Sequence, residues 1–129
     1  MANPLYKKLG LKDEQKVVLK SFPENYFDLL IHIPEIEECE PDEFADFIHL
    51  FETRMEDLEK SFLEAKTRMK QDGLIWISWP KKTSNVKTDL DYHSIKKLAV
   101  SMGLIDVKVS AIDEIWTATK YLIPKKNRT

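Results

Sequence analysis

The chain has 129 residues and a formal net charge of −2 at pH 7, with 43% hydrophobic and 33% charged residues. These values are typical of one globular domain, so we expect residues 1–129 to form a single α/β domain. The near-neutral charge argues against nucleic acid as a partner, because phosphate contacts dominate that kind of affinity. The lone cysteine, Cys39, excludes an internal disulfide, and no spacing of residues indicates a metal site or a cofactor motif.

The chain also lacks the usual signals for membranes and secretion. No run approaches the ~20 apolar residues of a membrane span. The N-terminal sequence MANPLYKK lacks the apolar core of a signal peptide. We therefore expect a cytoplasmic protein with no membrane partner.

The first predicted elements are a helical turn and a strand. Residues 4–9 begin with proline and are followed by Gly10, a combination typical of a short helix that ends in the left-handed conformation. The sequence KVVLK at residues 16–20 contains three consecutive apolar residues. Such a run favours a strand that is buried on both faces, as in a parallel sheet.

A second helix is predicted directly after this strand. Ser21 and Glu24 have the spacing of a capping box, and Pro23 suits the first turn of a helix. The helix is expected to run to about Leu30 and to be stopped by Pro34.

An acidic segment follows at residues 35–43, with the sequence EIEECEPDE. Ile36 is expected to begin a short strand at the edge of the sheet. The carboxylates could bind a cation or a partner, or they could form a solvated edge that keeps the protein soluble. They also disfavour a thiolate at Cys39, which argues against a reactive cysteine.

The next strand and helix have clearer patterns. Residues 45–51, ADFIHLF, predict a strand in which His49 is a packed residue and not a catalytic one. Thr53 and Glu56 form a second capping-box pattern, which predicts a helix start. The helix carries one apolar stripe at spacings of three and four residues, formed by Met55, Leu58, Phe62, Ala65 and Met69.

The central strand is predicted at residues 74–79, LIWISW. Pro80 ends it, because proline cannot donate a hydrogen bond to a sheet. Trp76 is expected to be buried and Trp79 to lie at the carboxyl end of the strand. A polar, basic loop then leads to a helix.

This helix is expected to be capped by Thr88 or Asp89 and to end at Gly103. Residues 104–111 then alternate, with Ile105, Val107 and Val109 on one side, which predicts a half-exposed strand. The last strand, residues 115–123, follows after a short turn and is therefore expected to be antiparallel.

Together these elements predict a three-layer α/β sandwich with a mainly parallel sheet of about five to six strands and an antiparallel last strand. Ligands of such sheets bind outside the carboxyl ends of the strands. The candidate ligand-binding residues are those expected at this edge: Ser21, Glu24, Trp79, Lys81, Lys82, Lys87, Asp113, Glu114 and Trp116.

The order of these segments resembles two known groups of proteins. From ADFIHLF through QDGLIWISWPKK and GLIDVKVSAIDE to IWTATKYLIPKK, the chain is similar to the second half of a class I methyltransferase domain, a Rossmann-like fold. Nearly the whole chain, and most clearly WPKKTS and VKVSAIDEIWTATKY, resembles a small bacterial family of unknown function. The resemblance implies a degenerate methyltransferase-like fold and no particular activity.

One difference from methyltransferases stands out. The resemblance implies a glycine-rich turn after the first strand, where the backbone approaches the cofactor, and an acidic residue at the end of the second strand. Here the first turn is SFPEN, without glycine. We therefore do not expect S-adenosylmethionine to bind in the usual way.

Three functional hypotheses remain. The favoured one is a non-catalytic binding or interaction protein with an anionic small molecule or a protein as partner. The alternative is a small enzyme acting on an anionic or nucleotide-like substrate. In that case the basic loop would bind the anion, Trp79 or Trp116 would provide a stacking face, and Asp113 or Glu114 would act as a base. A nucleic-acid-binding module is the third hypothesis, and the net charge argues against it.

The basic loop has three lysines within seven residues, Lys81, Lys82 and Lys87. The N-terminus of the following helix, expected near Thr88, would add its free N–H groups to an anion-attracting field. Lysines in a surface loop are more often simply solvated, and tryptophans at strand ends are more often packed in the core. Asp113 and Glu114 are also ordinary turn residues.

Overall fold

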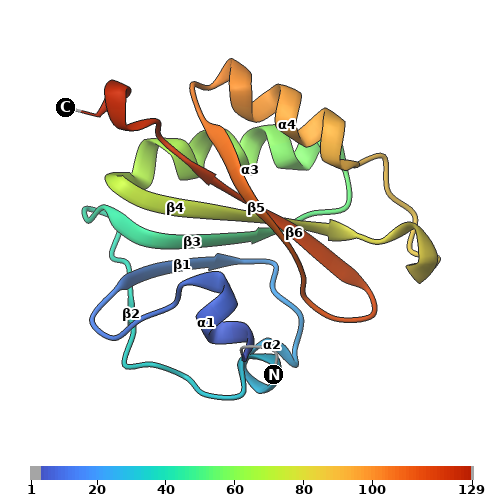
Figure 1. Cartoon of the computed structure of the whole chain (residues 1–129), viewed down its shortest axis with the longest axis horizontal. Coiled ribbons are helices and arrows are strands. Elements are labelled where there is room, and N and C mark those ends of the chain that lie inside the picture. Colours follow the sequence, from blue (N-terminus) through green and yellow to red (C-terminus); the bar gives the residue numbers. More distant parts are fainter. Residues whose placement is uncertain (1–3, 129) are drawn as a thin grey trace.

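The structure, a computed structural model, describes residues 4–128 and contains a six-stranded sheet between two layers of helices (Figure 1). The strands are β1 (Lys16–Lys20), β2 (Glu37–Glu38), β3 (Ala45–Phe51), β4 (Met69–Pro80), β5 (Ile105–Ala111) and β6 (Trp116–Leu122). The helices are α1 (Leu5–Leu9), α2 (Tyr26–Leu30), α3 (Met55–Arg68) and α4 (Tyr92–Ser101), with short 3-10 turns η1 (Lys82–Ser84) and η2 (Lys125–Asn127).

The strands lie in the order β2-β1-β3-β4-β6-β5. β1 pairs in parallel with β2 and β3, and β3 pairs in parallel with β4. β6 is antiparallel to both β4 and β5, so β5 runs in the same direction as the parallel strands. The predicted α/β sandwich, with a mainly parallel sheet and an antiparallel last strand, is confirmed.

Two hydrophobic cores lie on the two faces of the sheet. Ile75 and Ile77 of β4 belong to the core that α3 and α4 cover, and Trp76 belongs to the core that α1 and α2 cover. The indole Nε1–H of Trp76 donates a hydrogen bond to the Leu9 carbonyl oxygen at 2.7 Å, which ties α1 to the sheet. Trp76 is fully buried and Trp79 lies near the carboxyl end of β4, as predicted.

The predicted starts of three helices are wrong. Ser21 is not a cap: it has a left-handed φ of 57°, and α2 begins only after Asn25. The Thr53 side chain does not cap α3. Instead the carboxylate of Asp89, which is distant in sequence, accepts the hydrogen bond from the Met55 N–H at 2.7 Å. At α3 a distant carboxylate thus takes the place of the local cap that the spacing suggested, whereas α2 has no side-chain cap.

The start of α4 is also later than predicted. Asp91 is the N-cap, its carboxylate accepts from the Ser94 N–H at 2.7 Å, and the Ser94 hydroxyl pairs with the Asp91 N–H to complete a capping box. Thr88 instead donates its hydroxyl to the Thr53 carbonyl oxygen at 2.6 Å. α2 ends at Leu30, as predicted, but Ile31, with a φ of 73°, terminates it and Pro34 does not.

A bulge changes the predicted alternation of β5. The register shifts between Asp106 and Lys108, so Val107 lies at the irregularity. Ile105 pairs with Leu122, whereas Val109 pairs with Thr119, a residue of the opposite face of β6. Ile105, Val107 and Val109 therefore do not share one side, because the bulge reverses the alternation between them.

No helix within residues 4–128 is long and apolar enough to cross a membrane.

Candidate functional site

The carboxyl ends of the parallel strands meet at one edge of the sheet, which we call the carboxyl edge. Pro80 at the end of β4 pairs with Trp116 at the start of β6. The Lys81 N–H donates to the Ile115 carbonyl oxygen at 2.7 Å, which holds the basic loop against the β5–β6 turn. The Glu52 N–H donates to the Ser78 carbonyl oxygen at 3.1 Å, so the end of β3 belongs to the same edge.

The basic loop is shaped by its own hydrogen bonds. The Ser84 hydroxyl donates to the Lys81 carbonyl oxygen at 2.7 Å and accepts from the Val86 N–H at 3.2 Å. Lys81 is half-buried, while Lys82 and Lys87 are exposed. The loop thus presents two lysine side chains to solvent and holds the third at its base.

The helix that follows begins later than expected, and a carboxylate caps its N-terminus. Its first turn is capped by Asp91, and the hydrogen bond from the Ser94 N–H lowers the pKa of the Asp91 carboxyl. A negative charge therefore lies at the N-terminus of α4, close enough to Lys82 for the lysine to lower that pKa further. The Asp91 carboxylate satisfies the Ser94 N–H and opposes the positive end of the helix, so this terminus attracts an anion less than the sequence suggested.

The two acids of the β5–β6 turn differ in their surroundings. Oδ1 of Asp113 accepts hydrogen bonds from the Ile115 N–H at 2.9 Å and from the Trp116 N–H at 2.8 Å. Glu114 is exposed. Asp113 is therefore engaged in holding the turn, which is also the turn that receives Lys81.

The two candidate tryptophans lie on opposite faces of the sheet. Trp79 is 7% exposed and packs in the core under α3 and α4. Trp116 is half-buried in the other core, where its ring meets Phe51 edge-on at a centroid distance of 5.1 Å. They cannot form a common stacking face.

The turn after β1 carries Ser21 and Glu24, and both are exposed. Between them Phe22 packs against Tyr26 and Phe27, with ring centroids 5.7 Å from each. The candidate residues thus form two groups: the basic loop with the β5–β6 turn, and the turn after β1.

Sequence reasoning did not identify a buried polar chain beneath this edge. His49 is fully buried, with Nδ1 2.9 Å from the Tyr26 hydroxyl and Nε2 2.6 Å from the Ser78 hydroxyl. Burial lowers the pKa of His49 to about 3 and raises that of Tyr26, so both groups are neutral near pH 7. The only sequence signal of these linked hydrogen bonds was the presence of two polar residues, His49 and Ser78, inside apolar strands.

Glu52 follows β3 at the carboxyl edge and was not among the candidate site residues. Its side chain is 8% exposed, and its Oε2 lies 3.7 Å from Nζ of Lys20 without a hydrogen bond. The sequence signal for Glu52 as a site residue was its position directly after a strand that is buried.

A family model described as "Protein of unknown function (DUF3052)" matches residues 30–125, about three quarters of the chain. The chain belongs to this family. No curated protein is significantly similar to it.

Several solved structures that resemble this DUF3052 protein are described as methyltransferases. A SAM-dependent methyltransferase from Aquifex aeolicus is 14% identical, with a TM-score of 0.59, over 92% of this chain and 87% of that one. The DhpI–SAH complex is 9% identical, with a TM-score of 0.60, over 95% of this chain and 83% of that one. The CcbJ methyltransferase from Streptomyces caelestis is 8% identical, with a TM-score of 0.57, over 93% of this chain and 87% of that one.

A further match, LepI in complex with SAM, has a TM-score of 0.49, and the chain spans 39% of its length, too weak a likeness to carry an argument. At these identities the comparisons show the fold: the DUF3052 chain has a methyltransferase-like, Rossmann-like architecture, as its sequence resemblance implied.

Proposed function

We propose that this DUF3052 protein is a non-catalytic binding domain on a methyltransferase-like fold. One observation carries the proposal: the turn after β1 is occupied by the protein's own side chains. Ser21 has a φ of 57° where a glycine would be unstrained, and Pro23 and Phe22 add bulk. Phe22 is held by ring contacts with Tyr26 and Phe27.

The space beneath the carboxyl edge is filled in the same way. His49 stacks on Phe51 at a centroid distance of 4.3 Å, and Tyr26 meets both rings edge-on. Trp116 continues this aromatic packing through Phe51. Because these rings are buried against one another, a cofactor could enter only by displacing them.

Two acids of this edge, Asp113 and Glu52, favour a binding role over acid–base catalysis. Asp113 accepts two backbone hydrogen bonds, and Glu52 faces Lys20. A general base needs a carboxylate or imidazole within reach of substrate, and His49 is buried within its own hydrogen bonds.

The binding surface of the proposal is the exposed rim of the carboxyl edge, and its partner is anionic. Lys81, Lys82 and Lys87 supply the positive charge, and the hydrogen bond from Lys81 to the β5–β6 turn fixes the base of the loop. Because Lys82 and Lys87 are exposed, any such binding should weaken as salt rises, since charges are screened over about 8–10 Å at physiological ionic strength.

Two measurements test the proposal. Calorimetry with S-adenosylmethionine and S-adenosylhomocysteine should show no micromolar affinity. A thermal-shift series with acidic peptides should identify an anionic partner of the carboxyl edge; saturation at 100 times its dissociation constant stabilises by about 2.7 kcal/mol.

The double variant Lys81→Ala/Lys82→Ala should lose this shift at low salt while keeping its own stability. Lys125→Ala/Lys126→Ala, which removes two exposed lysines of the C-terminal segment, is the matched control for charge and should keep it. Micromolar binding of S-adenosylmethionine with methyl transfer would overturn the non-catalytic role. An unchanged shift in the Lys81/Lys82 variant would remove the carboxyl edge as the binding surface.

A further inference from the structure

Two lysines lie directly opposite each other on the sheet face that α1 covers. The bulge in β5 brings Lys108 into register with Lys120 of β6. Directly opposite residues of an antiparallel pair have Cβ atoms roughly 5 Å apart and point to the same face, so like charges there repel and destabilise the sheet.

Lys120 is also half-buried. Its ammonium group lies 5.8 Å from the ring centroid of the fully buried Trp76, so its aliphatic part covers that ring. The pKa of Lys120 is lowered, first by burial and then by the charges of Lys108 and Lys12. Lys12 lies in the loop between α1 and β1, three residues after Leu9, whose carbonyl oxygen accepts the hydrogen bond from the Trp76 ring that Lys120 overlies. We count it as the third member of this group, which we call the lysine triad.

The lysine triad has no carboxylate partner. Within residues 4–128, none of its three ammonium groups lies at ion-pair distance from an acid, whereas Lys16, Lys20, Lys70 and Lys96 all do. Lys108 is oriented by a hydrogen bond from Nζ to the Lys8 carbonyl oxygen at 3.2 Å. Three uncompensated cations from three segments form a charge arrangement that a bound anion would stabilise.

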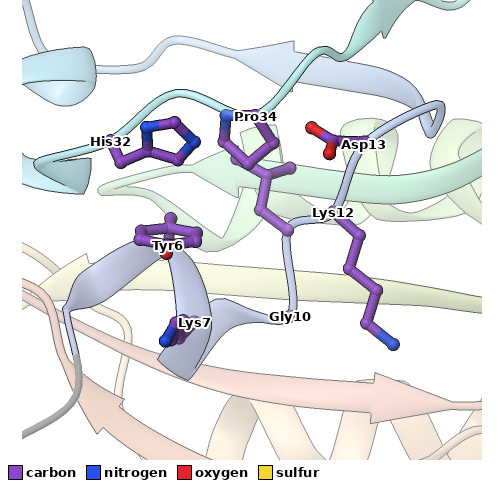
Figure 2. Close-up of a pocket in the computed structure, with 8 residues that line it drawn as sticks. Tyr6, Lys7, Gly10, Lys12, Asp13, His32 and Pro34 are labelled. Carbon is purple, nitrogen blue, oxygen red and sulfur yellow. The ribbon is translucent and has the colours of Figure 1, made fainter.

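A cavity of about 380 Å³ adjoins the triad and shares Lys12 with it. Figure 2 shows Tyr6 and His32 close together on its wall and the Lys12 side chain extending away from them. The rings of Tyr6 and His32 are in edge-on contact at 5.1 Å. Asp13, the carboxylate on this wall, accepts the Glu35 N–H at 2.7 Å and is therefore already engaged.

We propose that Lys12, Lys108 and Lys120 bind the phosphate group of a small phosphorylated molecule whose remaining part occupies the cavity lined by Tyr6, Gly10 and His32. The lysines supply the charge that a phosphate dianion requires. The cavity wall supplies the rings of Tyr6 and His32 for the organic part. This site is separate from the carboxyl edge, because Lys120 lies further along β6 than Trp116, which marks that edge.

The test is calorimetry with inorganic pyrophosphate and with adenosine diphosphate at low salt. Wild type should bind both, and binding should weaken as salt rises. Lys108→Ala/Lys120→Met should weaken binding at least tenfold, and so should Lys12→Ala, which changes only an exposed loop. Lys81→Ala/Lys82→Ala and Lys125→Ala/Lys126→Ala should leave the affinity unchanged, which separates this site from the proposed carboxyl-edge surface and from general charge.

A second readout distinguishes a binding site from a structural role. Without anion, Lys120→Met should melt at the wild-type temperature or above, because it removes both a buried charge and a repulsion. The phosphate proposal fails if neither probe binds at low salt, or if the triad variants bind as well as wild type. It also fails if single-stranded oligonucleotide binds at the triad while pyrophosphate and adenosine diphosphate do not.

Discussion

The Tyr26 hydroxyl lies 2.9 Å from Nδ1 of His49, and this contact joins α2 to β3 inside the protein. On its other side His49 reaches the Ser78 hydroxyl at 2.6 Å, so the imidazole connects a helix with two neighbouring strands. All three side chains are fully buried. A protonated imidazole here would carry an uncompensated charge in the core.

The first prediction follows from this burial. The pKa of His49 is lowered from about 6.5 to about 3 in the folded state, so the unfolded chain takes up the proton first as pH falls. The contribution of neutral His49 to the free energy of unfolding is complete above pH 6.5. It decreases toward pH 3, by up to about 1.4 kcal/mol per pH unit. Urea unfolding of His49→Gln between pH 4 and 7 should show a shallower pH slope than wild type. His93→Gln, an exposed control, should keep the wild-type slope; equal slopes for His49→Gln and wild type would contradict the prediction.

The second prediction concerns Asp113 in the β5–β6 turn. Asp113→Ala removes the acceptor of the Ile115 and Trp116 N–H groups and should cost about 1–3 kcal/mol in urea unfolding. Asp113→Asn keeps an oxygen in the same position and should cost less than about 1 kcal/mol. Should both substitutions destabilise equally, the charge and not the hydrogen-bonding oxygen would be what the turn requires.

The strands were mostly well predicted because their signal is local, although β4 begins already at Met69, which the apolar stripe had assigned to the preceding helix. KVVLK, ADFIHLF and LIWISW are apolar runs that suit a strand covered on both faces, and all three form parallel strands between two cores. The contact between the basic loop and the β5–β6 turn was also predictable. The loop follows β4 and the turn follows β5, and the carboxyl ends of these two strands lie at the same edge of the sheet. The Lys81-to-Ile115 hydrogen bond is that contact.

The misplaced helix starts show where local patterns fail. Ser21 and Thr53 both have the spacing of a capping box, but neither caps a helix. The Met55 N–H finds its acceptor in Asp89, which is 34 residues away and which no local pattern indicates. Only Asp91, with Ser94 three residues later, forms the local box.

The lysine triad could not be predicted for a related reason. Strict alternation places Asp106 and Lys108 on the same side of β5. The bulge between them turns Asp106 toward Tyr92 of α4 and Lys108 toward Lys8 of α1. The single unpaired residue, Val107, thus decides which face of the sheet receives the charge of Lys108. Nothing in the sequence DVKVS identifies Val107 as the bulge.

The third prediction separates steric crowding from backbone strain at two glycines. A Cβ on Gly73 would lie 2.9 Å from the Ala45 carbonyl oxygen and 3.1 Å from that of Lys70, both rigid backbone atoms. A Cβ on Gly103 would meet nothing within 4 Å, but its φ of 79° is unfavourable for alanine by about 1–2 kcal/mol. Gly73→Ala should therefore lower the urea midpoint more than Gly103→Ala. If Gly103→Ala is the more damaging, the Ala45–Gly73 approach is looser than the structure shows.

The last prediction concerns Ile77 at the centre of β4. It is fully buried, pairs with Leu50 of β3 on one side and Thr119 of β6 on the other, and packs in the core under α3 and α4. Ile77→Ala removes methyl groups from a site that neighbouring strands prevent from collapsing, so urea unfolding should show a loss of about 2–5 kcal/mol. Val100→Ala on α4, where valine is 57% exposed, should change stability by less than about 0.5 kcal/mol. The dependence of unfolding free energy on urea should stay the same for both variants, because the area exposed on unfolding hardly changes. A loss at Ile77 no larger than that at Val100 would mean that β4 is not the buried centre of the sheet.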